Sequence, residues 1–126
     1  MRVNAPSAAA KRILCVEDDR DTRELMGVLL TTYGYEPVIS TSVSAALEQI
    51  SLGGFALCIL DNWLGQSSGI DLCKRIRAHD QHTPIIFYSG AAYKTDIQNG
   101  LNAGAQAYVV KPDFEHLEET IDRLVL

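Results

Sequence analysis

The sequence predicts an α/β domain in which a five-stranded parallel sheet is covered by helices on both faces, and three observations support this. Short apolar runs alternate with amphipathic segments five times over 11–126, roughly every 22 to 25 residues. Several of the apolar runs lack the alternation of a half-exposed strand, which is typical of strands buried between helix layers. A chain of 126 residues is also too short for the eight units of a closed β/α barrel.

The apolar runs and the amphipathic segments give the expected positions of the elements. Five strands are expected at runs rich in β-branched and aromatic residues: 13–16, 36–40, 55–60, 84–88 and 107–110. Five helices are expected where apolar residues recur every three or four positions: 20–32, 43–52, a segment that starts after Ser68 and carries Ile70 to Ile76, 94–103 and 113–125. Because a helix separates each pair of successive strands, the strands are expected to run parallel.

Residues that favour helix ends support these boundaries. Asp19, Ser68 and Asp113 stand where a helix begins, and each has a side-chain oxygen that can accept a hydrogen bond from a free backbone N–H. Gly34 and Gly104 stand where helices end and can adopt the left-handed conformation that closes a helix. The pattern of helices is therefore supported by local chemistry as well as by periodicity.

The composition fits one globular domain. Hydrophobic residues make up 47% of the chain and charged residues 21%, which argues against disorder. Eleven Lys and Arg against sixteen Asp and Glu give a net charge of −5, which disfavours nucleic acid or an anionic membrane as the main partner. Three cysteines in apolar segments suggest reduced thiols and a cytoplasmic location. Residues 1–10 lack periodicity and an apolar core, so we interpret them as a flexible N-terminal segment and not as a secretory signal.

Polar residues follow four of the five expected strands. In open α/β sheets, binding sites form outside the carboxyl ends of the strands. The residues that the sequence places at this edge are Glu17-Asp18-Asp19, Asp61-Asn62, Ser89-Gly90 and Lys111-Pro112. Each has an ordinary interpretation alone, as a helix cap or a loop residue. Together they form a constellation that points to a site.

This constellation has the chemistry of phosphoryl transfer to an aspartate. If the first and third strands are neighbours, the carboxylates of Glu17, Asp18 and Asp61 lie close together and repel one another. A hard divalent cation such as Mg²⁺ removes that conflict and keeps positions open for water and phosphate oxygens. Lys111 can add a positive charge and Ser89 a hydrogen-bond donor to a phosphoryl oxygen.

Four stretches of the chain resemble the receiver domain of two-component response regulators, the CheY-like family. They are ILCVEDD at 13–19, CILDNWLGQSSGIDL at 58–72, PIIFYSG at 84–90 and AYVVKP at 107–112. The resemblance covers nearly all of 11–126, in order and spacing, so this range is identified as a receiver domain. It implies a doubly wound, flavodoxin-like fold with strand order 2-1-3-4-5.

The resemblance also implies a role for each site residue. Asp61 corresponds to the phosphoacceptor, and Glu17 and Asp18 to the acidic pair that binds Mg²⁺ or Mn²⁺ with it. Trp63 corresponds to the residue whose backbone carbonyl is a ligand for the metal, and Ser89 to the switch hydroxyl. Tyr108 corresponds to the switch aromatic and Lys111 to the phosphate-binding lysine. The Lys111–Pro112 peptide bond is expected to be cis.

The function implied by the resemblance is signalling and not enzymatic turnover of a substrate. A sensor histidine kinase or a histidine phosphotransfer protein is the expected donor, with Mg²⁺-dependent transfer and slow self-hydrolysis in the chain itself. Phosphorylation is expected to move Ser89, to turn Tyr108 inward, and to change the surface of 94–103, 107–110 and 113–125. That surface is expected to bind a downstream protein, with the chain a monomer or a homodimer through it, and no direct contact with nucleic acid or membrane. The chain is interpreted as a stand-alone receiver or the receiver portion of a longer regulator.

The sequence departs from the family pattern at two glycines. Gly65 stands where a proline is usual, four residues after the expected acceptor, and Gly90 replaces the more usual alanine. Both changes are expected to affect loop stiffness and not the phosphoryl ligands. The bulky Trp63 is expected to hinder the water that hydrolyses the phosphoryl group, which predicts a long-lived phosphorylated form.

Four other classes of protein fit the sequence less well. The main alternative is a pseudo-receiver, a docking module that is not regulated by phosphorylation, but Asp61, the acidic pair and Lys111 are all present. A haloacid-dehalogenase-type phosphohydrolase requires Asp-x-Asp, and position 63 is Trp. No phosphate-binding loop of a nucleotide enzyme occurs, and three acids after the first strand would repel the phosphate of a flavin. Residues outside the site are interpreted as ordinary surface or core: Lys74, Arg75 and Arg77 as a solvated helix face, His79, His82 and His116 as surface, Cys58 and Cys73 as core.

Overall fold

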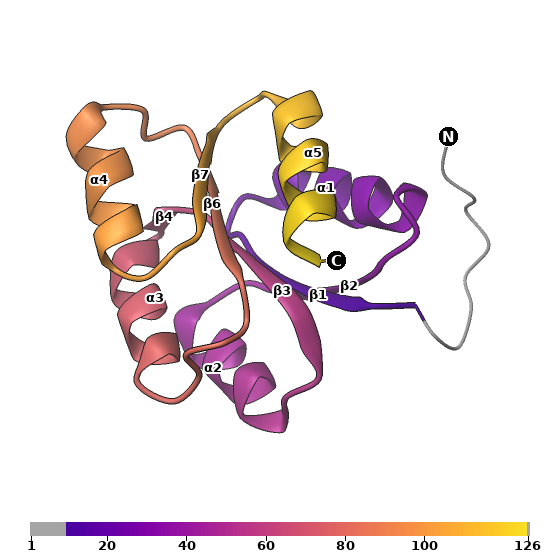
Figure 1. Ribbon diagram of the computed structural model, residues 1–126, viewed down its shortest axis with the longest axis horizontal. Helices are drawn as coiled ribbons and strands as arrows, with labels where there is room; N and C mark the ends of the chain where they lie inside the picture. Colours follow the sequence, from indigo (N-terminus) through magenta and orange to yellow (C-terminus); the bar gives the residue numbers. More distant parts are fainter. Residues whose placement is uncertain (1–9, 126) are drawn as a thin grey trace.

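Five parallel strands form the central sheet of the computed structural model, which describes residues 10–125 (Figure 1). Their order across the sheet is β2-β1-β3-β6-β7. The bounds are β1 Arg12–Val16, β2 Glu36–Ser40, β3 Phe55–Leu60, β6 Ile85–Ser89 and β7 Ala107–Val110. Counted along the chain, β6 and β7 are the fourth and fifth strands of this sheet. The predicted fold class and the strand order 2-1-3-4-5 are therefore confirmed. The expected flexible segment at 1–10 lies, apart from its last residue, outside the described residues, as does Leu126 at the end of the expected receiver range.

Helices cover both faces of the sheet. They are α1 Arg20–Thr32, α2 Val43–Leu52, α3 Gly69–Arg77, α4 Lys94–Asn102 and α5 Phe114–Val125. In Figure 1, α1 and α5 lie on one side of the strands and α2, α3 and α4 on the other. No helix among residues 10–125 is long and apolar enough to span a bilayer.

Side chains that alternate along β1 divide the core into two layers. Ile13 and Cys15 join the cluster beneath α1 and α5, whereas Leu14 and Val16 join the cluster beneath α2 and α3. Both sets are almost fully buried. A strand that supplies both layers has no polar face, and this explains why the apolar runs in the sequence do not alternate.

The predicted helix caps are present. The Asp19 side chain accepts from the Thr22 N–H at 2.9 Å, and the Ser68 hydroxyl accepts from the Asp71 N–H at 3.0 Å. Asp113 caps α5 in the same way. The Lys111–Pro112 bond is cis, as expected.

The structure differs from the expected elements in a few places. The fourth long strand runs over 85–89 and not 84–88, so Ser89 belongs to the strand and not to the loop after it. On α1, Leu25 and Val28 are exposed although they share the apolar spacing of the buried residues. A short antiparallel hairpin of β4 Trp63–Leu64 and β5 Ser67–Ser68 was not predicted, because strands of two residues have no periodicity to detect.

Candidate functional site

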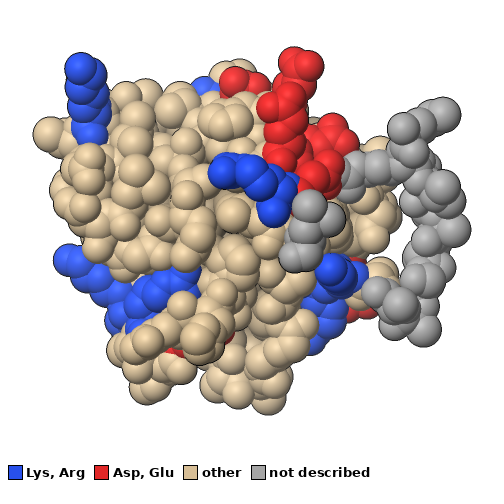
Figure 2. All heavy atoms as spheres, viewed as in Figure 1, with Lys and Arg blue, Asp and Glu red and all other residues tan. Residues whose placement is uncertain are grey.

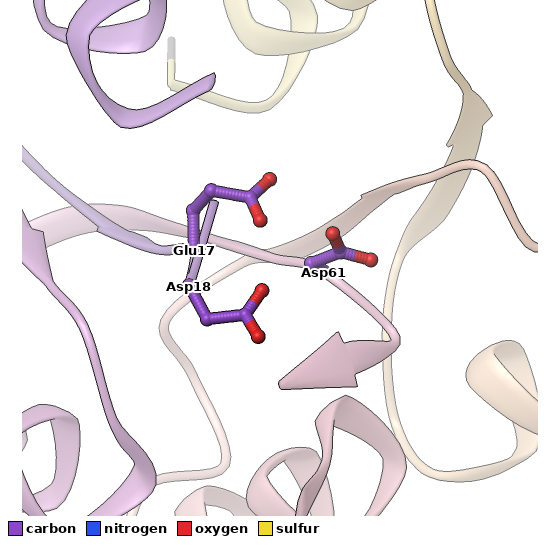
Figure 3. A group of neighbouring side chains, drawn as sticks. All are labelled: Glu17, Asp18 and Asp61. Carbon is purple, nitrogen blue, oxygen red and sulfur yellow. The ribbon is translucent and has the colours of Figure 1, made fainter. Parts of the chain in front are cut away.

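The carboxyl ends of the parallel strands meet at one edge of the sheet. The register pairs Val16 of β1 with Leu60 of β3, and Ser89 of β6 with Val110 of β7. The polar residues at or just after these ends are thereby brought together. Figure 3 shows the carboxylates of Glu17 and Asp18, after β1, facing that of Asp61, after β3.

These three carboxylates could hold a divalent cation. One oxygen from each of Glu17, Asp18 and Asp61 lies within 4.8 Å of the others, and this is the one such group of metal-ligating side chains among residues 10–125. Glu17 and Asp61 are buried, at 3% and 6% exposed, whereas Asp18 is exposed. Hard oxygen ligands with one open side suit Mg²⁺ or Mn²⁺, which bind a few carboxylates and retain exchangeable water. The residues present therefore fit the predicted metal.

Lys111 places one cation between the two buried acids. Its ammonium lies 2.7 Å from a carboxylate oxygen of Glu17 and 2.9 Å from one of Asp61. Burial by itself would lower the pKa of Lys111, but the two carboxylates outweigh it and raise that pKa above its ordinary value of 10.5. Lys111 therefore remains charged at neutral pH.

Asp61 is the most heavily bonded acid of the site. Its Oδ1 accepts from the Ser89 hydroxyl at 2.8 Å and from the Trp63 N–H at 3.1 Å, and its Oδ2 accepts from Lys111. Burial pushes the pKa of Asp61 upward, but these hydrogen bonds prevail and hold it below its ordinary 3.8. A carboxylate that is ionised and oriented in this way is suited to act as a nucleophile.

In the same surroundings, the pKa of Glu17 shifts in the opposite direction from that of Asp61. Burial and the nearby charge of Asp61 raise the pKa of Glu17 above its ordinary 4.5, although Lys111 and the Asp19 N–H oppose the rise. Two acids of one site thus have pKa values that are pushed apart.

The segment just after Asp61 packs closely against the start of α3. A Cβ added at Gly69 would lie 2.0 Å from the backbone oxygen of Asp61, so only glycine fits there. Gly65 closes the β4–β5 hairpin with a φ of +65°, the left-handed conformation that favours glycine. The substitution of proline by glycine in this loop is therefore accompanied by a defined turn. Its effect on loop stiffness stays a prediction, as does the backbone carbonyl of Trp63 as a metal ligand.

Trp63 lies over the edge of the site. The residue is 62% exposed, and a Cβ at Gly90 would be 3.6 Å from the Trp63 ring. A Cβ at Gly90 would therefore be in ordinary van der Waals contact with the indole. The ring thus lies beside the loop that follows Ser89, and in sequence Trp63 stands two positions after Asp61.

The hydroxyl of Tyr108 is held inside the protein. It donates to the Ala91 backbone oxygen at 2.7 Å, and the ring stacks on Phe87 with centroids 5.4 Å apart. The inward turn of Tyr108 that the sequence led us to expect in response to phosphorylation stays a prediction. Sequence reasoning also missed Asn62, whose amide lies 3.4 Å from the Tyr108 hydroxyl. Its place after Asp61 was visible, but no sequence pattern gives the direction of its side chain.

Among the residues interpreted as ordinary surface or core, the cysteines agree with the structure and Arg77 does not. Cys58 and Cys73 are buried and free, as expected for core residues. Burial raises the pKa of both thiols, that of Cys58 to about 12. The interpretation of Arg77 as part of a solvated helix face is wrong. Its guanidinium donates to the backbone oxygens of Asp80, Thr83 and Gly104 because α3 ends beside the loop that precedes β7.

Comparison with protein families matches one model to most of the chain. The response regulator receiver domain matches residues 13–122. Curated relatives include the nisin biosynthesis regulatory protein NisR of Lactococcus lactis, 38% identical over 101 residues, which are 80% of this chain and 44% of that protein. The transcriptional regulatory protein DltR of Streptococcus agalactiae is 37% identical over 80% of this chain and 45% of its own length. The chain thus spans about half the length of the curated relatives that it matches.

Solved structures give the same picture. The response regulator TrrA of Thermotoga maritima, crystallised in complex with Mg²⁺–BeF, is 32% identical with a TM-score of 0.82, covering 90% of this chain and 98% of that one. A CheY-like receiver domain of Methanospirillum hungatei is 30% identical with a TM-score of 0.83, covering 92% and 94%.

Proposed function

Because this chain belongs to the response regulator receiver domain family, we propose that it accepts a phosphoryl group on Asp61 and thereby changes its contacts with other proteins. The observation that carries the proposal is the pair of bonds that Lys111 and Ser89 make to the two oxygens of the Asp61 carboxylate. They keep the acid ionised, and the exposed Asp18 has a carboxylate oxygen within 4.8 Å of it. We assign the receiver to 11–126.

The donor that suits this site is a phosphohistidine on a sensor kinase or a phosphotransfer protein. A carboxylate oxygen of Asp61 attacks phosphorus in line, the P–N bond breaks, and its electron pair returns to the imidazole nitrogen. Glu17, Asp18 and Asp61 would hold Mg²⁺ or Mn²⁺, with the Trp63 carbonyl as a further ligand. When bound, the metal neutralises charge on the phosphoryl oxygens. The product is an acyl phosphate. Water hydrolyses it later to inorganic phosphate and restores the Asp61 carboxylate, so the chain acts as a resettable signalling module.

Lys111 and Ser89 are already placed for the product. When Asp61 is phosphorylated, Lys111 no longer faces a free Asp61 carboxylate, and its ammonium can then pair with a phosphoryl oxygen. The Ser89 hydroxyl donates to Asp61 at 2.8 Å and can donate to a second phosphoryl oxygen after a small shift. Because Ser89 belongs to β6, which pairs with β7, its shift can be passed to the surface of α4, β7 and α5.

That surface is the place we assign to partner binding, with a downstream protein or a second copy of the chain as the occupant. On the face drawn in Figure 2, acidic side chains gather over α5 and the basic ones lie apart in small groups. Such a face offers no continuous basic surface to a nucleic-acid backbone.

Phosphorylation of Asp61 can be tested directly. The protein is incubated with Mg²⁺ and acetyl phosphate, a small acyl phosphate, and its intact mass is measured. We expect a single phosphate adduct that is absent in Asp61→Asn and present in Asp71→Asn, a matched change of an exposed acid in the first turn of α3. No adduct with any donor would favour the alternative, a pseudo-receiver that docks without phosphorylation. An adduct that persists in Asp61→Asn would place the acceptor elsewhere.

A further inference from the structure

The loop between β1 and α1 carries two of the three carboxylates that could hold a cation, and different elements hold its residues. The Glu17 N–H donates to the Ser40 oxygen at 3.1 Å, which ties residue 17 to the end of β2. Asp19 caps α1 through two bonds from Thr22, one from its N–H at 2.9 Å and one from its hydroxyl at 2.7 Å. Asp18 stands between these two anchored residues and belongs to neither anchor.

The carboxylate of Asp18 is not held by the side chains around it. Within residues 10–125 it makes no hydrogen bond or ion pair, and the residue is exposed. A Cβ added at Gly65, at the tip of the β4–β5 hairpin, would lie 3.7 Å from Asp18 Oδ2, an ordinary contact that fixes no direction. Figure 3 shows the carboxylate facing that of Asp61. This direction is therefore set by the Asp18 backbone.

Arg23 holds that backbone from the first turn of α1. Its Nη1 donates to the Asp18 backbone oxygen at 2.6 Å and lies 3.5 Å from that of Glu17, and the residue is partly buried. Nη1 carries two N–H groups, so one nitrogen can serve both carbonyls. The base of the side chain is fixed as well, because the Arg23 N–H donates to the Asp19 oxygen at 2.9 Å.

We propose that Arg23 is a positioning residue of the metal site, which holds the Asp18 backbone so that its carboxylate stays within reach of the other two. The oxygens of Glu17, Asp18 and Asp61 that could bind the ion lie within 4.8 Å of one another. Loss of a group that orients a metal ligand weakens metal binding by roughly 10- to 100-fold. The role toward Mg²⁺ rests on the proposed function, whereas the bond between Arg23 and Asp18 does not.

Charge and position predict opposite effects of removing Arg23. A guanidinium near the site repels a cation, so a role through charge alone would make Arg23→Met bind Mg²⁺ more tightly. If Arg23 positions Asp18, the same change weakens binding, and we expect a loss of roughly tenfold in affinity. Mg²⁺ titration of the full chain, followed by tryptophan fluorescence, measures this. Unchanged or tighter binding in Arg23→Met would overturn the proposal.

The matched control is Arg20→Met, which removes the same charge three positions earlier on α1. The Arg20 side chain is 82% exposed and pairs with Glu24, so we expect the Mg²⁺ affinity to change by less than about twofold. A loss in Arg20→Met equal to that in Arg23→Met would mean that neither residue acts through the Asp18 backbone.

A second measurement reports the bond itself and involves no metal. The sequence contains one Asp–Asp step, Asp18–Asp19, so a chain labelled with ¹³C′- and ¹⁵N-aspartate gives one carbonyl–amide correlation by NMR. We expect this Asp18 carbonyl signal to move by more than its linewidth in Arg23→Met, because the carbonyl loses its donor, and to stay in place in Arg20→Met. An unmoved signal in Arg23→Met would contradict the proposal.

Arg23→Lys decides the matter if Arg23→Met does not fold. It keeps the charge but has a single donor centre on a different geometry, so the Asp18 carbonyl signal should move and the Mg²⁺ affinity should fall about threefold. A moved signal with wild-type affinity would overturn the positioning role. If the wild type binds no Mg²⁺, the metal site of the proposed function fails, while the carbonyl signal still tests the bond of Arg23.

Discussion

The ammonium of Lys111 lies 2.9 Å from a carboxylate oxygen of Asp61, and the side chains are only 23% and 7% exposed. The same ammonium reaches Glu17, so one positive charge compensates two buried negative charges. The balance is incomplete, and the residual negative charge explains why the site can attract a divalent cation.

Removal of the Lys111 ammonium should destabilise the chain, and Mg²⁺ should restore part of the lost stability. Lys111→Met leaves Glu17 and Asp61 without their shared partner, and we expect a loss of about 2–3 kcal/mol in the free energy of unfolding, somewhat less than for a fully buried pair. Urea denaturation with EDTA and with Mg²⁺ measures this, and Mg²⁺ should stabilise the variant more than the wild type. Lys74→Met, an exposed change on α3, is the control. Equal losses in both variants, or no added effect of Mg²⁺, would contradict this account of the site.

Mg²⁺ binding should weaken as the pH falls through the raised pKa of Glu17. Because this pKa is higher in the folded chain than its ordinary 4.5, proton binding at Glu17 favours the fold at low pH, and that contribution is lost as pH rises through the raised value. The pKa of Asp61 is lowered, so its contribution to the stability of the fold has the opposite pH dependence. That contribution is present above pH 3.8 and is lost as the pH falls through the lowered pKa. Since a metal competes with the proton on Glu17, its affinity should decline at pH values still above 4.5.

Glu17→Gln separates this titration from the rest of the site. We expect the Mg²⁺ affinity of this variant to fall roughly tenfold, and we expect it no longer to decrease with falling pH in the range above 4.5. Binding is followed through the fluorescence of Trp63, the one tryptophan of the chain. Asp18→Asn should also weaken binding but keep the acid decline. An unchanged pH profile in Glu17→Gln would show that another group controls it.

Much of the fold and site followed from the sequence because its determinants are local. Asp19 and Ser68 cap helices through hydrogen bonds to residues three positions on, and such bonds are determined by the local sequence. The apolar strands placed Asp61 and Lys111 at one edge because parallel strands end together. Residue type and order were sufficient for these inferences.

Other features depend on side-chain directions that only the packed chain defines. Asn62 reaches Tyr108 across 46 positions of sequence, and Arg77 reaches Gly104 across 27. Both are polar residues in ordinary surroundings when seen in sequence. Their roles arise from the approach of α3 and β3 to β7, and no periodicity encodes which rotamer makes the contact.

Trp63 should protect the acyl phosphate from water. Its ring lies beside Gly90, which follows Ser89, so Trp63→Ala should shorten the half-life of phosphorylated Asp61 several-fold, on the order of threefold or more. The half-life is measured by intact mass after removal of the phosphodonor. Tyr93→Ala removes another exposed aromatic ring, at the start of α4, and should leave the half-life unchanged. A rapid loss of phosphate in the wild type that Trp63→Ala does not alter would rule out this role.

Arg77 should contribute to stability and not to phosphorylation. Besides its bonds to the oxygens of Asp80, Thr83 and Gly104, its guanidinium donates to the Gln106 side chain at 2.9 Å. A lysine ammonium is a single donor centre and cannot match this planar set of partners. Arg77→Lys should therefore lower the free energy of unfolding by about 2–3 kcal/mol, since several carbonyls lose their donors.

The matched control for this change lies two positions earlier on the same helix. Arg75 is exposed, so Arg75→Lys should alter stability by less than about 0.5 kcal/mol. Urea denaturation compares the two variants, and the phosphate adduct on Asp61 should form at the wild-type level in both. Equal stabilities for the two variants would mean that the bonds of Arg77 contribute little net energy. A loss of phosphorylation in folded Arg77→Lys would instead mean that the end of α3 is coupled to the acceptor, because Gln106 also binds the N–H of Ile85 at 2.7 Å at the start of β6, the strand that carries Ser89.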